Sequence, residues 1–517
     1  MGTETELKLT IQPEDLRKVL RLGWLQSLAS GPARRKKLVS IYFDTGNFVL
    51  RDHRITLRVR KIGRRRVQTI KALPDGATGV FCRNEWEAEI ESDGPDFQFA
   101  KGTALAPLIT RKLKRAIKPV FETNIARTAL PLHSGASDIE AAFDRGYIRT
   151  GRRRMPVNEI ELELEKGKPE DLVRLAGKFA RLLPVGYGAC TKAERGYRLS
   201  AGQRGEPVEA GTIVLSSRAS VAEAFAVIGF SCLHHIAGNE EAVRRGAPEG
   251  IHQMRVGLRR LRAAISLFKE IVRGPETDRI KAELKWLTEQ LAPARDFDVL
   301  VREGVIPLRE AVPDQPEIAL LKSDLEVRRE DGFARAKATV ASARYRDALL
   351  HTVLWLSGGK WLRNSNVLVA AKRNRPVRDF AADILRLRTR KIVKKVARLE
   401  SLDARRRHRL RIAAKELRYA TEFFASLFNG RKARAGRRSF LKSLKALQDA
   451  LGKLNDIVVH RKLAGEYAHP RTRGKRRSAK AYAMGVLTGR EQKLAKTCMT
   501  AAVKSGKRLP DAPRFWL

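Results

Sequence analysis

The sequence predicts an α+β chain of two domains, a β-rich N-terminal half and an all-helical C-terminal half. Three observations support this prediction. Charged and apolar residues alternate with period two through the first 200 residues, helical periodicity runs from about residue 218 to residue 508, and the Gly-rich stretch between them shows neither pattern. We therefore expect domains at residues 1–203 and 218–510, joined by a linker at 204–217.

Period-two alternation marks the strands of the first domain. Glu4, Glu6 and Lys8 share one face of a strand, and the same alternation returns at 54–61, 84–90 and 158–167. Further candidate strands lie at 38–44, 66–72, 119–130 and 138–149. About eight antiparallel strands predict a closed or nearly closed sheet, and the amphipathic stretch 169–183 predicts a helix that covers part of its apolar outer face.

The charged faces of these strands carry both signs, which is compatible with two arrangements. One is a solvent-exposed face held by cross-strand ion pairs. The other is a tunnel whose charged side chains point inward. There, basic groups would bind an anion, and carboxylates would hold a hard cation such as Mg²⁺.

The ordered set of charged motifs resembles the CYTH family, the triphosphate tunnel metalloenzymes, over residues 1–200. The resemblance rests on the ExExK strand at 4–8, YFDT at 42–45, Arg58-x-Arg60, Lys71, Glu85-x-Glu87, Arg127, Asp144, EIELEL at 159–164 and Lys192. It implies an eight-stranded antiparallel β tunnel with covering helices, which binds a triphosphate and a divalent metal. It also implies hydrolysis of inorganic triphosphate, with hydrolysis of thiamine triphosphate or cyclisation of ATP as the alternatives.

The resemblance assigns roles by residue type. Phosphate contacts are expected from Lys8, Arg58, Arg60, Lys71, Arg127 and Lys192, since Arg offers a two-pronged donor and Lys a point charge. Ligands for Mg²⁺ or Mn²⁺ are expected from Glu4, Glu6, Glu85, Glu87, Asp144, Glu161 and Glu163. One metal ion would shield the phosphates and a second would acidify the attacking water. For Glu89, Glu159 and Glu165, a structural ion pair is an equal alternative.

Two similar segments organise the helical half, at 252–268 and 408–424. In each, four basic residues recur at i, i+3, i+7 and i+10, so they form one stripe along a helix. The stripes are His252, Arg255, Arg259 and Arg262, and His408, Arg411, Lys415 and Arg418. Similar segments follow each stripe, at 286–301 and 444–459, which predicts a duplication with repeats at about 218–370 and 376–510. We expect both stripes to surround one shared groove.

The duplicated pattern resembles the CHAD domain over residues 215–510. The stripes carry the resemblance together with ARDFDV at 294–299 and LQDALGKLND at 447–456. It implies that the basic groove binds inorganic polyphosphate. Within these segments, Arg295, Asp296, Asp298, Asn455 and Asp456 are expected to orient the stripe residues rather than to contact the ligand.

The charge of the chain points to a polyanionic partner. Its 517 residues include 104 Lys and Arg against 57 Asp and Glu, a net charge of +47. Most of the excess follows residue 210, where 65 basic residues face 31 acidic ones. Polyphosphate, nucleic acid or an acidic membrane surface would suit such a field. Nucleic acid is the less favoured partner, because aromatic residues for base stacking make up only 6% of the chain.

Other features bear on location and on the alternatives to an enzyme. We expect a soluble cytoplasmic protein, suited to polyphosphate granules. The four cysteines are scattered, the chain has no signal-like start, and no apolar run approaches the roughly 20 residues of a membrane helix. A non-enzymatic granule protein is the alternative function. Two dense basic runs, 34–37 and 471–477, are expected to be mobile loops that add only to the long-range field.

Overall fold

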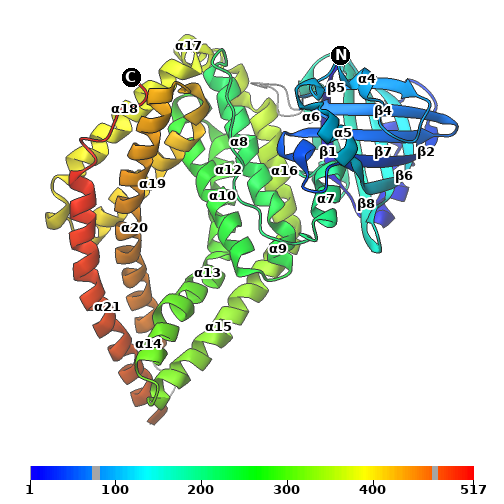
Figure 1. The fold of residues 1–517 in the computed structure, drawn as a ribbon. Coiled ribbons are helices and arrows are strands. Elements are labelled where there is room, and N and C mark those ends of the chain that lie inside the picture. Colours follow the sequence, from blue (N-terminus) through cyan, green and yellow to red (C-terminus); the bar gives the residue numbers. More distant parts are fainter. Residues whose placement is uncertain (1, 73–81, 469–474) are drawn as a thin grey trace.

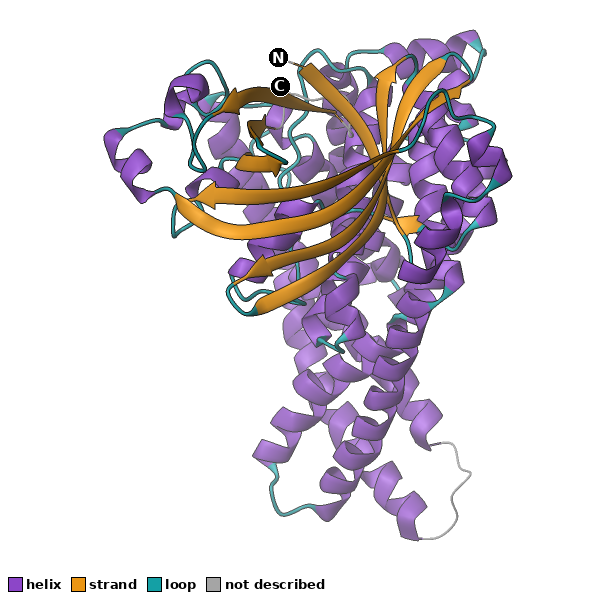
Figure 2. Ribbon diagram, turned by 90° about the vertical axis from the view of Figure 1, so that its right-hand side faces the viewer, coloured by secondary structure: helices purple, strands orange, loops and turns teal. Residues whose placement is uncertain are grey.

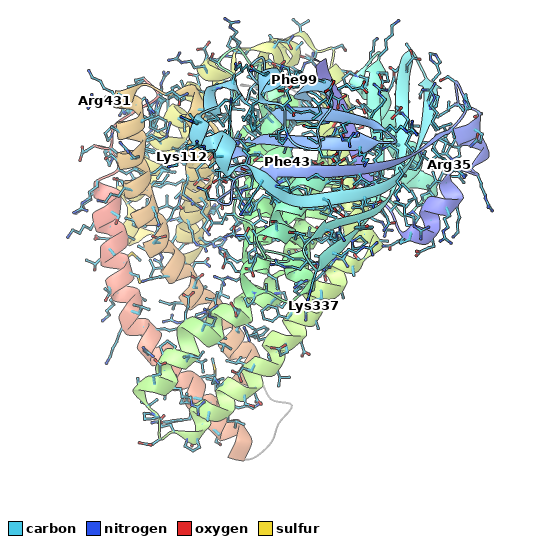
Figure 3. The ribbon with its side chains drawn as sticks, turned by 45° about the vertical axis from the view of Figure 1, so that its right-hand side comes forward. Arg35, Phe43, Phe99, Lys112, Lys337 and Arg431 are labelled. Atoms are coloured by element: carbon cyan, nitrogen blue, oxygen red, sulfur yellow. The ribbon has the colours of Figure 1, made fainter. Side chains whose placement is uncertain are left out.

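The computed structural model describes residues 2–72, 82–468 and 475–517. A sheet-bearing half lies beside a helical half whose two arms separate and meet again at their far ends (Figure 1). Exposed basic side chains are spread over both halves, as Lys112, Lys337 and Arg431 illustrate (Figure 3). The α+β prediction is confirmed.

The N-terminal half is built on one antiparallel sheet, curled as Figure 2 shows. Among the described residues it has nine strands: β1 (Gly2–Thr10), β2 (Arg34–Asp44), β3 (Ile55–Ile62), β4 (Arg65–Ala72), β5 (Cys82–Ile90), β6 (Lys118–Ser134), β7 (Ser137–Thr150), β8 (Arg153–Lys166) and β9 (Gly186–Tyr187). Their order is β5-β4-β3-β2-β6-β7-β8-β1-β9. β1 also pairs with β5, so the first strand contacts both ends of the seven-strand run from β5 to β8. The predicted count of eight misses the two-residue β9.

The alternation of the sequence sorts side chains between the two faces of the sheet. On β1, Leu7 and Leu9 are buried in the hydrophobic core, while Lys8 between them points to the other face. Cross-strand register then groups the charged residues. Lys8 pairs with Glu161 of β8, and on β8 the neighbouring Glu159 pairs with Asp144 of β7. The charged faces therefore point into the curl of the sheet, which is the inward arrangement of the two considered.

Helices cover the outside of this sheet. They are α1 (Pro13–Val19), α2 (Gly23–Gln26), α3 (Val49–Asp52), α4 (Phe97–Ala100), η1 (Ala106–Leu108), α5 (Arg111–Ala116) and α6 (Pro169–Leu182). Helix α7 (Lys192–Ser200) instead packs on β6, β7 and β8 from inside the curl, where Tyr197 contacts Phe121. The predicted helix at 169–183 is α6, which buries Leu172, Leu175 and Phe179. It packs on β1 and β8 on one side and on helix α16 of the other half on its second side (Figure 1).

The C-terminal half is helical throughout its described residues. Its helices are α8 (Val221–Gly238), α9 (Glu240–Arg244), α10 (Pro248–Leu267), α11 (Lys269–Val272), α12 (Pro275–Gln290), α13 (Ala292–Val299), η2 (Leu300–Val305), α14 (Ile306–Ala311), α15 (Pro316–Ala341), α16 (Ala343–Gly358), η3 (Lys360–Arg363), α17 (Val367–Asn374), α18 (Val377–Val396), η4 (Leu399–Ser401), α19 (Ala404–Phe423), η5 (Ala425–Leu427), α20 (Arg431–Ala468) and α21 (Lys475–Lys507).

The two similar units differ after their stripe helices, α10 and α19. In the first, α12 ends before Pro293 and a new helix starts, because proline lacks the N–H that would continue the ladder. In the second, the corresponding residues belong to the single 38-residue helix α20. The equivalent leucines Leu287 and Leu447 are nevertheless both buried. The two segments therefore bury leucines at corresponding positions although their helices break differently.

One hydrophobic core runs through both halves. It includes Leu162 and Phe179 from the sheet half together with Phe225, Leu349 and Phe424 from the helical half. The connection between the halves joins this core as well, since Ile213 and Leu215 are buried. The backbone N–H of Leu215 also donates to Ser426 Oγ over 2.8 Å. Residues 204–217 are therefore packed against the helices rather than extended as a free tether.

One described segment, Val221–Arg244, is long and apolar enough to cross a membrane by length and composition alone. This differs from the expectation that no such run exists. In the structure, 67% of its apolar window is buried among other parts of the chain. A core helix of a globular protein meets the same length and composition criteria, so the finding is weak evidence for a membrane span.

Candidate functional site

A cavity of about 260 Å³ lies on the inner face of the curled sheet. We call it the sheet cavity. All six expected phosphate-binding cations line it, and so do six of the seven expected metal ligands: Lys8, Arg58, Arg60, Lys71, Arg127, Lys192, Glu6, Glu85, Glu87, Asp144, Glu161 and Glu163. The seventh, Glu4, lies on β1, and its side chain falls outside the described part of the structure.

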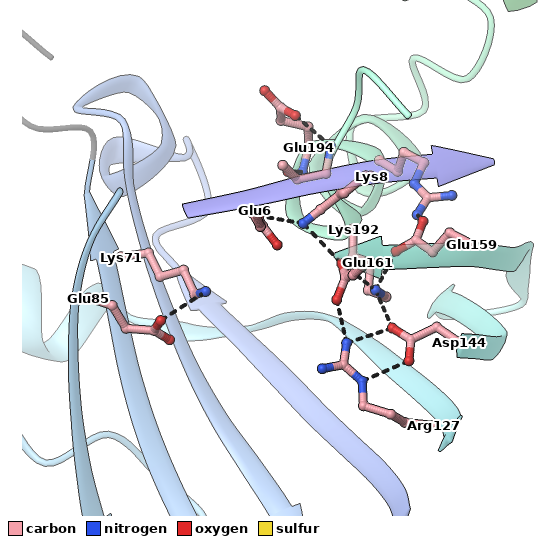
Figure 4. Close-up of polar contacts among 12 residues, drawn as sticks. Glu6, Lys8, Lys71, Glu85, Arg127, Asp144, Glu159, Glu161, Lys192 and Glu194 are labelled. Carbon is pink, nitrogen blue, oxygen red and sulfur yellow. Dashed lines mark hydrogen bonds and ion pairs between the residues drawn. The ribbon is translucent and has the colours of Figure 1, made fainter. Parts of the chain in front are cut away.

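One wall of the sheet cavity is a compact ion-pair network built from β1, β6, β7, β8 and α7 (Figure 4). Arg127 donates two hydrogen bonds of 2.7 Å to Asp144 and also pairs with Glu161. Lys192 Nζ lies 2.6 Å from Asp144 and 2.9 Å from Glu161. Lys8 Nζ lies 2.9 Å from Glu161 and 2.5 Å from Glu6. Cations and carboxylates therefore compensate one another within this wall.

The network keeps its members charged. Burial by itself would raise the pKa of Glu161, but Lys192, Lys8 and Arg127 lower that pKa well below its usual value. The pKa of Asp144 is also lowered, because Lys192 and Arg127 outweigh its burial. Burial would lower the pKa values of Lys8 and Lys192, yet the neighbouring carboxylates raise both above the ordinary lysine value.

The opposite wall, from β3, β4 and β5, holds a looser set of pairs. Lys71 Nζ lies 3.2 Å from Glu85, and Arg58 lies 3.6 Å from Glu85 and 3.7 Å from Glu87. Glu87 also accepts a hydrogen bond of 2.7 Å from Thr69. Figure 4 shows the Lys71–Glu85 pair apart from the network of the other wall. The cavity thus offers cations from two sides to whatever lies between them.

Arg60 differs from the other cavity cations. Its Nε donates to Ser40 Oγ over 3.2 Å, and among the described residues no carboxylate lies within ion-pair distance of it. Burial and the nearby Arg58 and Arg127 lower the pKa of Arg60 to about 10. An anion in the cavity would offset this repulsion.

Three carboxylates in the cavity wall could hold a metal ion. One oxygen each from Asp144, Glu159 and Glu161 lies within 4.8 Å of the others. Carboxylate oxygens suit hard cations such as Mg²⁺ or Mn²⁺, and the lowered pKa values of Asp144 and Glu161 favour the ionised form that a metal requires. The donor set therefore fits a divalent metal. Glu85 and Glu87, on the opposite wall, do not belong to this group.

The three glutamates left open by the sequence have different surroundings. Glu159 is buried and pairs with Lys192 and with Arg195 of α7. Glu89 is exposed and accepts two hydrogen bonds, of 3.0 and 2.8 Å, from Arg65. Glu165 is exposed as well, one residue before the end of β8. Only Glu159 lies beside the cavity network.

Two charged residues of the cavity lining were not identified from the sequence. The prediction of a mobile loop at 34–37 is wrong, because β2 begins at Arg34, and Lys36 lines the cavity opposite Arg127. Arg35 lies at the end of the sheet (Figure 3). Counting back in twos from Tyr42 would have found Lys36. Glu140 also lines the cavity, paired in register with Glu163. The second basic run, 471–477, falls mostly outside the described residues.

The two stripes meet because α10 and α19 pack on each other. Equivalent acidic residues support equivalent cations: Arg255 lies 3.6 Å from Asp296, and Arg411 lies 3.8 Å from Asp456. His408 Nδ1 lies 2.5 Å from Asn455 Oδ1. Buried Arg260, which belongs to neither stripe, joins the two helices through an ion pair of 2.7 Å with Glu422. We call the eight stripe residues together the stripe site.

The stripe site holds cations that repel one another. Burial, then Arg411 and Arg259, lower the pKa of Lys415 to about 7. Burial lowers the pKa of Arg255 to about 10, with a further contribution from Arg259. Burial and Arg295 lower the pKa of His252 to about 4. Four arginines also have a buried Nε without a hydrogen-bond partner in the described structure: Arg255, Arg259, Arg411 and Arg418.

Comparison with known proteins gives matches to both halves. The CYTH domain model matches residues 2–197, and the CHAD domain model matches residues 228–465. An inorganic triphosphatase from Haemophilus influenzae is 29% identical over 211 residues, which are 39% of this chain and 56% of that protein. The chain thus spans little more than half of that relative.

Solved structures also resemble the chain. The CHAD domain from the plant Ricinus communis is 31% identical, covering 58% of this chain and 96% of that domain, with a TM-score of 0.49. A Hippeastrum protein with a dominant triphosphatase activity is 18% identical, covering 39% of this chain and 96% of that one, with a TM-score of 0.26.

Proposed function

This chain is a CYTH domain followed by a CHAD domain, and from that premise we propose that the sheet cavity hydrolyses inorganic triphosphate with a divalent metal ion. We also propose that the stripe site binds inorganic polyphosphate. The observation that carries the first proposal is that six cations and six carboxylates of the expected set line one cavity. The name of the Haemophilus influenzae relative agrees with this activity.

In the proposed reaction, the cavity arginines bind the phosphates and the carboxylates hold the metal ion. Arg58, Arg60 and Arg127 would bind phosphate oxygens from the two walls and hold the triphosphate in line for attack by water. Asp144, Glu159 and Glu161 would hold Mg²⁺ or Mn²⁺. When bound, the metal would shield the phosphates and lower the pKa of water. Water adds to a terminal phosphorus while its bridging P–O bond breaks, which gives phosphate and pyrophosphate.

The stripe site supports polyphosphate as the partner of the helical half. Polyphosphate carries roughly one charge per phosphate and no bases, so it needs cations and N–H donors only. The stripe site supplies both in excess of its own carboxylates. The aromatic residues near it, such as Phe268 and Phe424, are buried in the core and offer no stacking surface to a base. Binding of this kind would bring a cytoplasmic protein to polyphosphate granules.

Phosphate release by the full-length chain with Mg²⁺ tests the catalytic proposal. Inorganic triphosphate, thiamine triphosphate, ATP and long-chain polyphosphate are compared, and selective turnover of inorganic triphosphate is expected. No release from any of the four, with polyphosphate still bound, would instead make this a non-enzymatic binding protein.

Competition tests the binding proposal. Duplex DNA at equal phosphate concentration and moderate salt should leave bound polyphosphate in place. Displacement by DNA would contradict the assignment of the stripe site.

A further inference from the structure

Lys192 is the cation that contacts all three carboxylates of the possible metal group, and it is the first residue of α7. The turn that starts α7 is fixed by a reciprocal cap. Thr191 Oγ1 accepts a hydrogen bond of 3.1 Å from the Glu194 N–H, and the Glu194 carboxylate accepts one of 2.7 Å from the Thr191 N–H. The place of this turn decides where the ammonium group of Lys192 lies in the sheet cavity.

Helix α8 of the helical half contacts the same turn from outside. His234 Nδ1 lies 3.1 Å from the carbonyl oxygen of Ala189, just before the cap. Because a carbonyl oxygen only accepts hydrogen bonds, Nδ1 carries the proton and donates it. The second ring nitrogen of His234 lies 3.9 Å from the Glu194 carboxylate, which forms half of the cap. One CHAD side chain therefore contacts both the backbone before the cap and the cap itself.

The far end of α7 also docks on α8. The Arg198 guanidinium donates to the carbonyl oxygen of Gly238, the last residue of α8, over 3.4 Å, and to that of Glu206 over 3.1 Å. On its opposite side, α7 is pressed against β6, since a Cβ added at Gly196 would lie 2.1 Å from the Phe121 ring. The helix that brings Lys192 into the cavity is thus held between the sheet and α8.

We propose that His234 is a positioning residue for the sheet cavity, so that a CHAD helix sets the place of Lys192 and with it the affinity for triphosphate. This inference rests on the proposed function of the cavity and adds a dependence on the other domain. The next residue of α8 extends the connection: His235 Nε2 lies 3.1 Å from Oε1 of Gln253, beside His252 of the first stripe. The same helix therefore contacts α7 on one side and the stripe helix α10 on the other.

Substitutions at His234 in the full-length chain test the proposal. Triphosphate affinity is measured by calorimetry with a chelator and no divalent metal, and phosphate release is measured separately with Mg²⁺. His234→Ala is expected to weaken triphosphate binding by about tenfold. The substitution removes the hydrogen bond to Ala189 that holds the turn, and so displaces the charged contact that Lys192 makes with the triphosphate. His234→Asn, whose amide can donate to Ala189, is expected to restore most of the loss. Polyphosphate affinity should not change.

A double-variant cycle separates positioning from general damage. If His234 acts through Lys192, His234→Ala should weaken binding little further when Lys192→Ala is already present. His351→Ala, which removes an exposed histidine elsewhere on the helical half, is the matched control and should bind triphosphate like the unaltered chain.

The outcomes distinguish this inference from the proposed function. Unaltered binding and turnover in His234→Ala would overturn the positioning role and leave the catalytic proposal standing. Equal losses in His234→Ala and His234→Asn, or losses that add to those of Lys192→Ala, would overturn it too. If the unaltered chain binds triphosphate without releasing phosphate and His234→Ala still binds it more weakly, hydrolysis is refuted and positioning is supported.

Discussion

The sheet cavity and the stripe site both gather partly buried cations, but they compensate charge in opposite ways. In the cavity, Lys8 and Lys192 have raised pKa values because carboxylates surround them. In the stripe site, Lys415 and Arg255 have lowered pKa values because burial and neighbouring cations disfavour their charge. The first is an internally balanced network and the second carries excess positive charge.

This difference indicates which ligand each site suits. A balanced network can accept an anion and a cation together, as in a metal–triphosphate complex. The phosphates would bind the cationic side chains, and the metal ion would bind the carboxylates that those side chains release. A site with excess positive charge and unpaired Nε groups gains most from an anion alone. The predictions below test this contrast, beginning with the largest expected effect.

Glu161→Gln should abolish the charge balance between the cations and carboxylates of the sheet cavity. It removes the carboxylate shared by Lys8, Arg127 and Lys192, together with one oxygen ligand of the possible metal group. We expect triphosphate hydrolysis to fall by about 10³-fold or more and the free energy of unfolding to fall by about 3 kcal/mol. Phosphate release and thermal unfolding measure the two effects. Polyphosphate affinity serves as the control, and its loss would contradict separate sites.

Arg259→Gln combined with Arg411→Gln should weaken ligand binding but stabilise the fold, whereas Glu161→Gln should lower both activity and stability. Polyphosphate affinity is expected to fall by about 100-fold, as two charged contacts are lost. The melting temperature without ligand is expected to rise, because two mutually repelling cations are removed. Labelled polyphosphate binding and thermal unfolding provide the measurements. A lower melting temperature in the ligand-free variant would show that the stripe cations stabilise the fold and would break the contrast.

Polyphosphate binding should weaken as pH rises from 6 to 8, since Lys415 has a pKa of about 7 and loses its charge over this range. Polyphosphate affinity measured between pH 6 and 8 checks this effect. The same group also affects stability. An unfolded lysine titrates near 10.5, so between about pH 7 and 10.5 the unfolded chain binds one more proton than the folded chain, and Lys415 makes the free energy of unfolding rise with pH. Lys415→Arg should flatten the profile, and an unchanged slope in that variant would assign the pH dependence to another group.

Glu89→Gln should have the smallest effect. Glu89 belongs to the same alternating strand as Glu85 and Glu87, but it is exposed and pairs with Arg65 away from the cavity. Exposed ion pairs contribute little. Hydrolysis, triphosphate affinity and polyphosphate affinity are all expected to match the unaltered chain. A clear loss of turnover would show that the functional site includes residues beyond those that line the cavity.

The parts of the site that follow from local periodicity could be predicted from the sequence. Period two placed Lys8, Arg58 and Glu161 on the charged faces of their strands, and the i, i+3, i+7 spacing placed Arg255 and Arg259 on one stripe. Those relations depend only on strand and helix geometry.

The parts that depend on contacts between distant segments could not be predicted in this way. Glu159 joins the network because α7 returns to the sheet with Lys192 and Arg195. His234 meets Ala189 only because α8 docks on that turn. Lys36 was hidden for a different reason: four consecutive basic residues obscure the alternation at the start of β2.

Helix α6 also has a consequence for synthesis on the ribosome. One side of it packs on β1 and β8, while Val173 and Gly177 on its second side contact α16, which begins at residue 343. At 5–20 residues per second, the ribosome needs roughly 10–30 s to translate the intervening stretch. During that interval the sheet half can fold, but the second side of α6 stays uncovered. A nascent chain stalled between α7 and α16 is therefore a natural client for a chaperone that binds apolar helix surface.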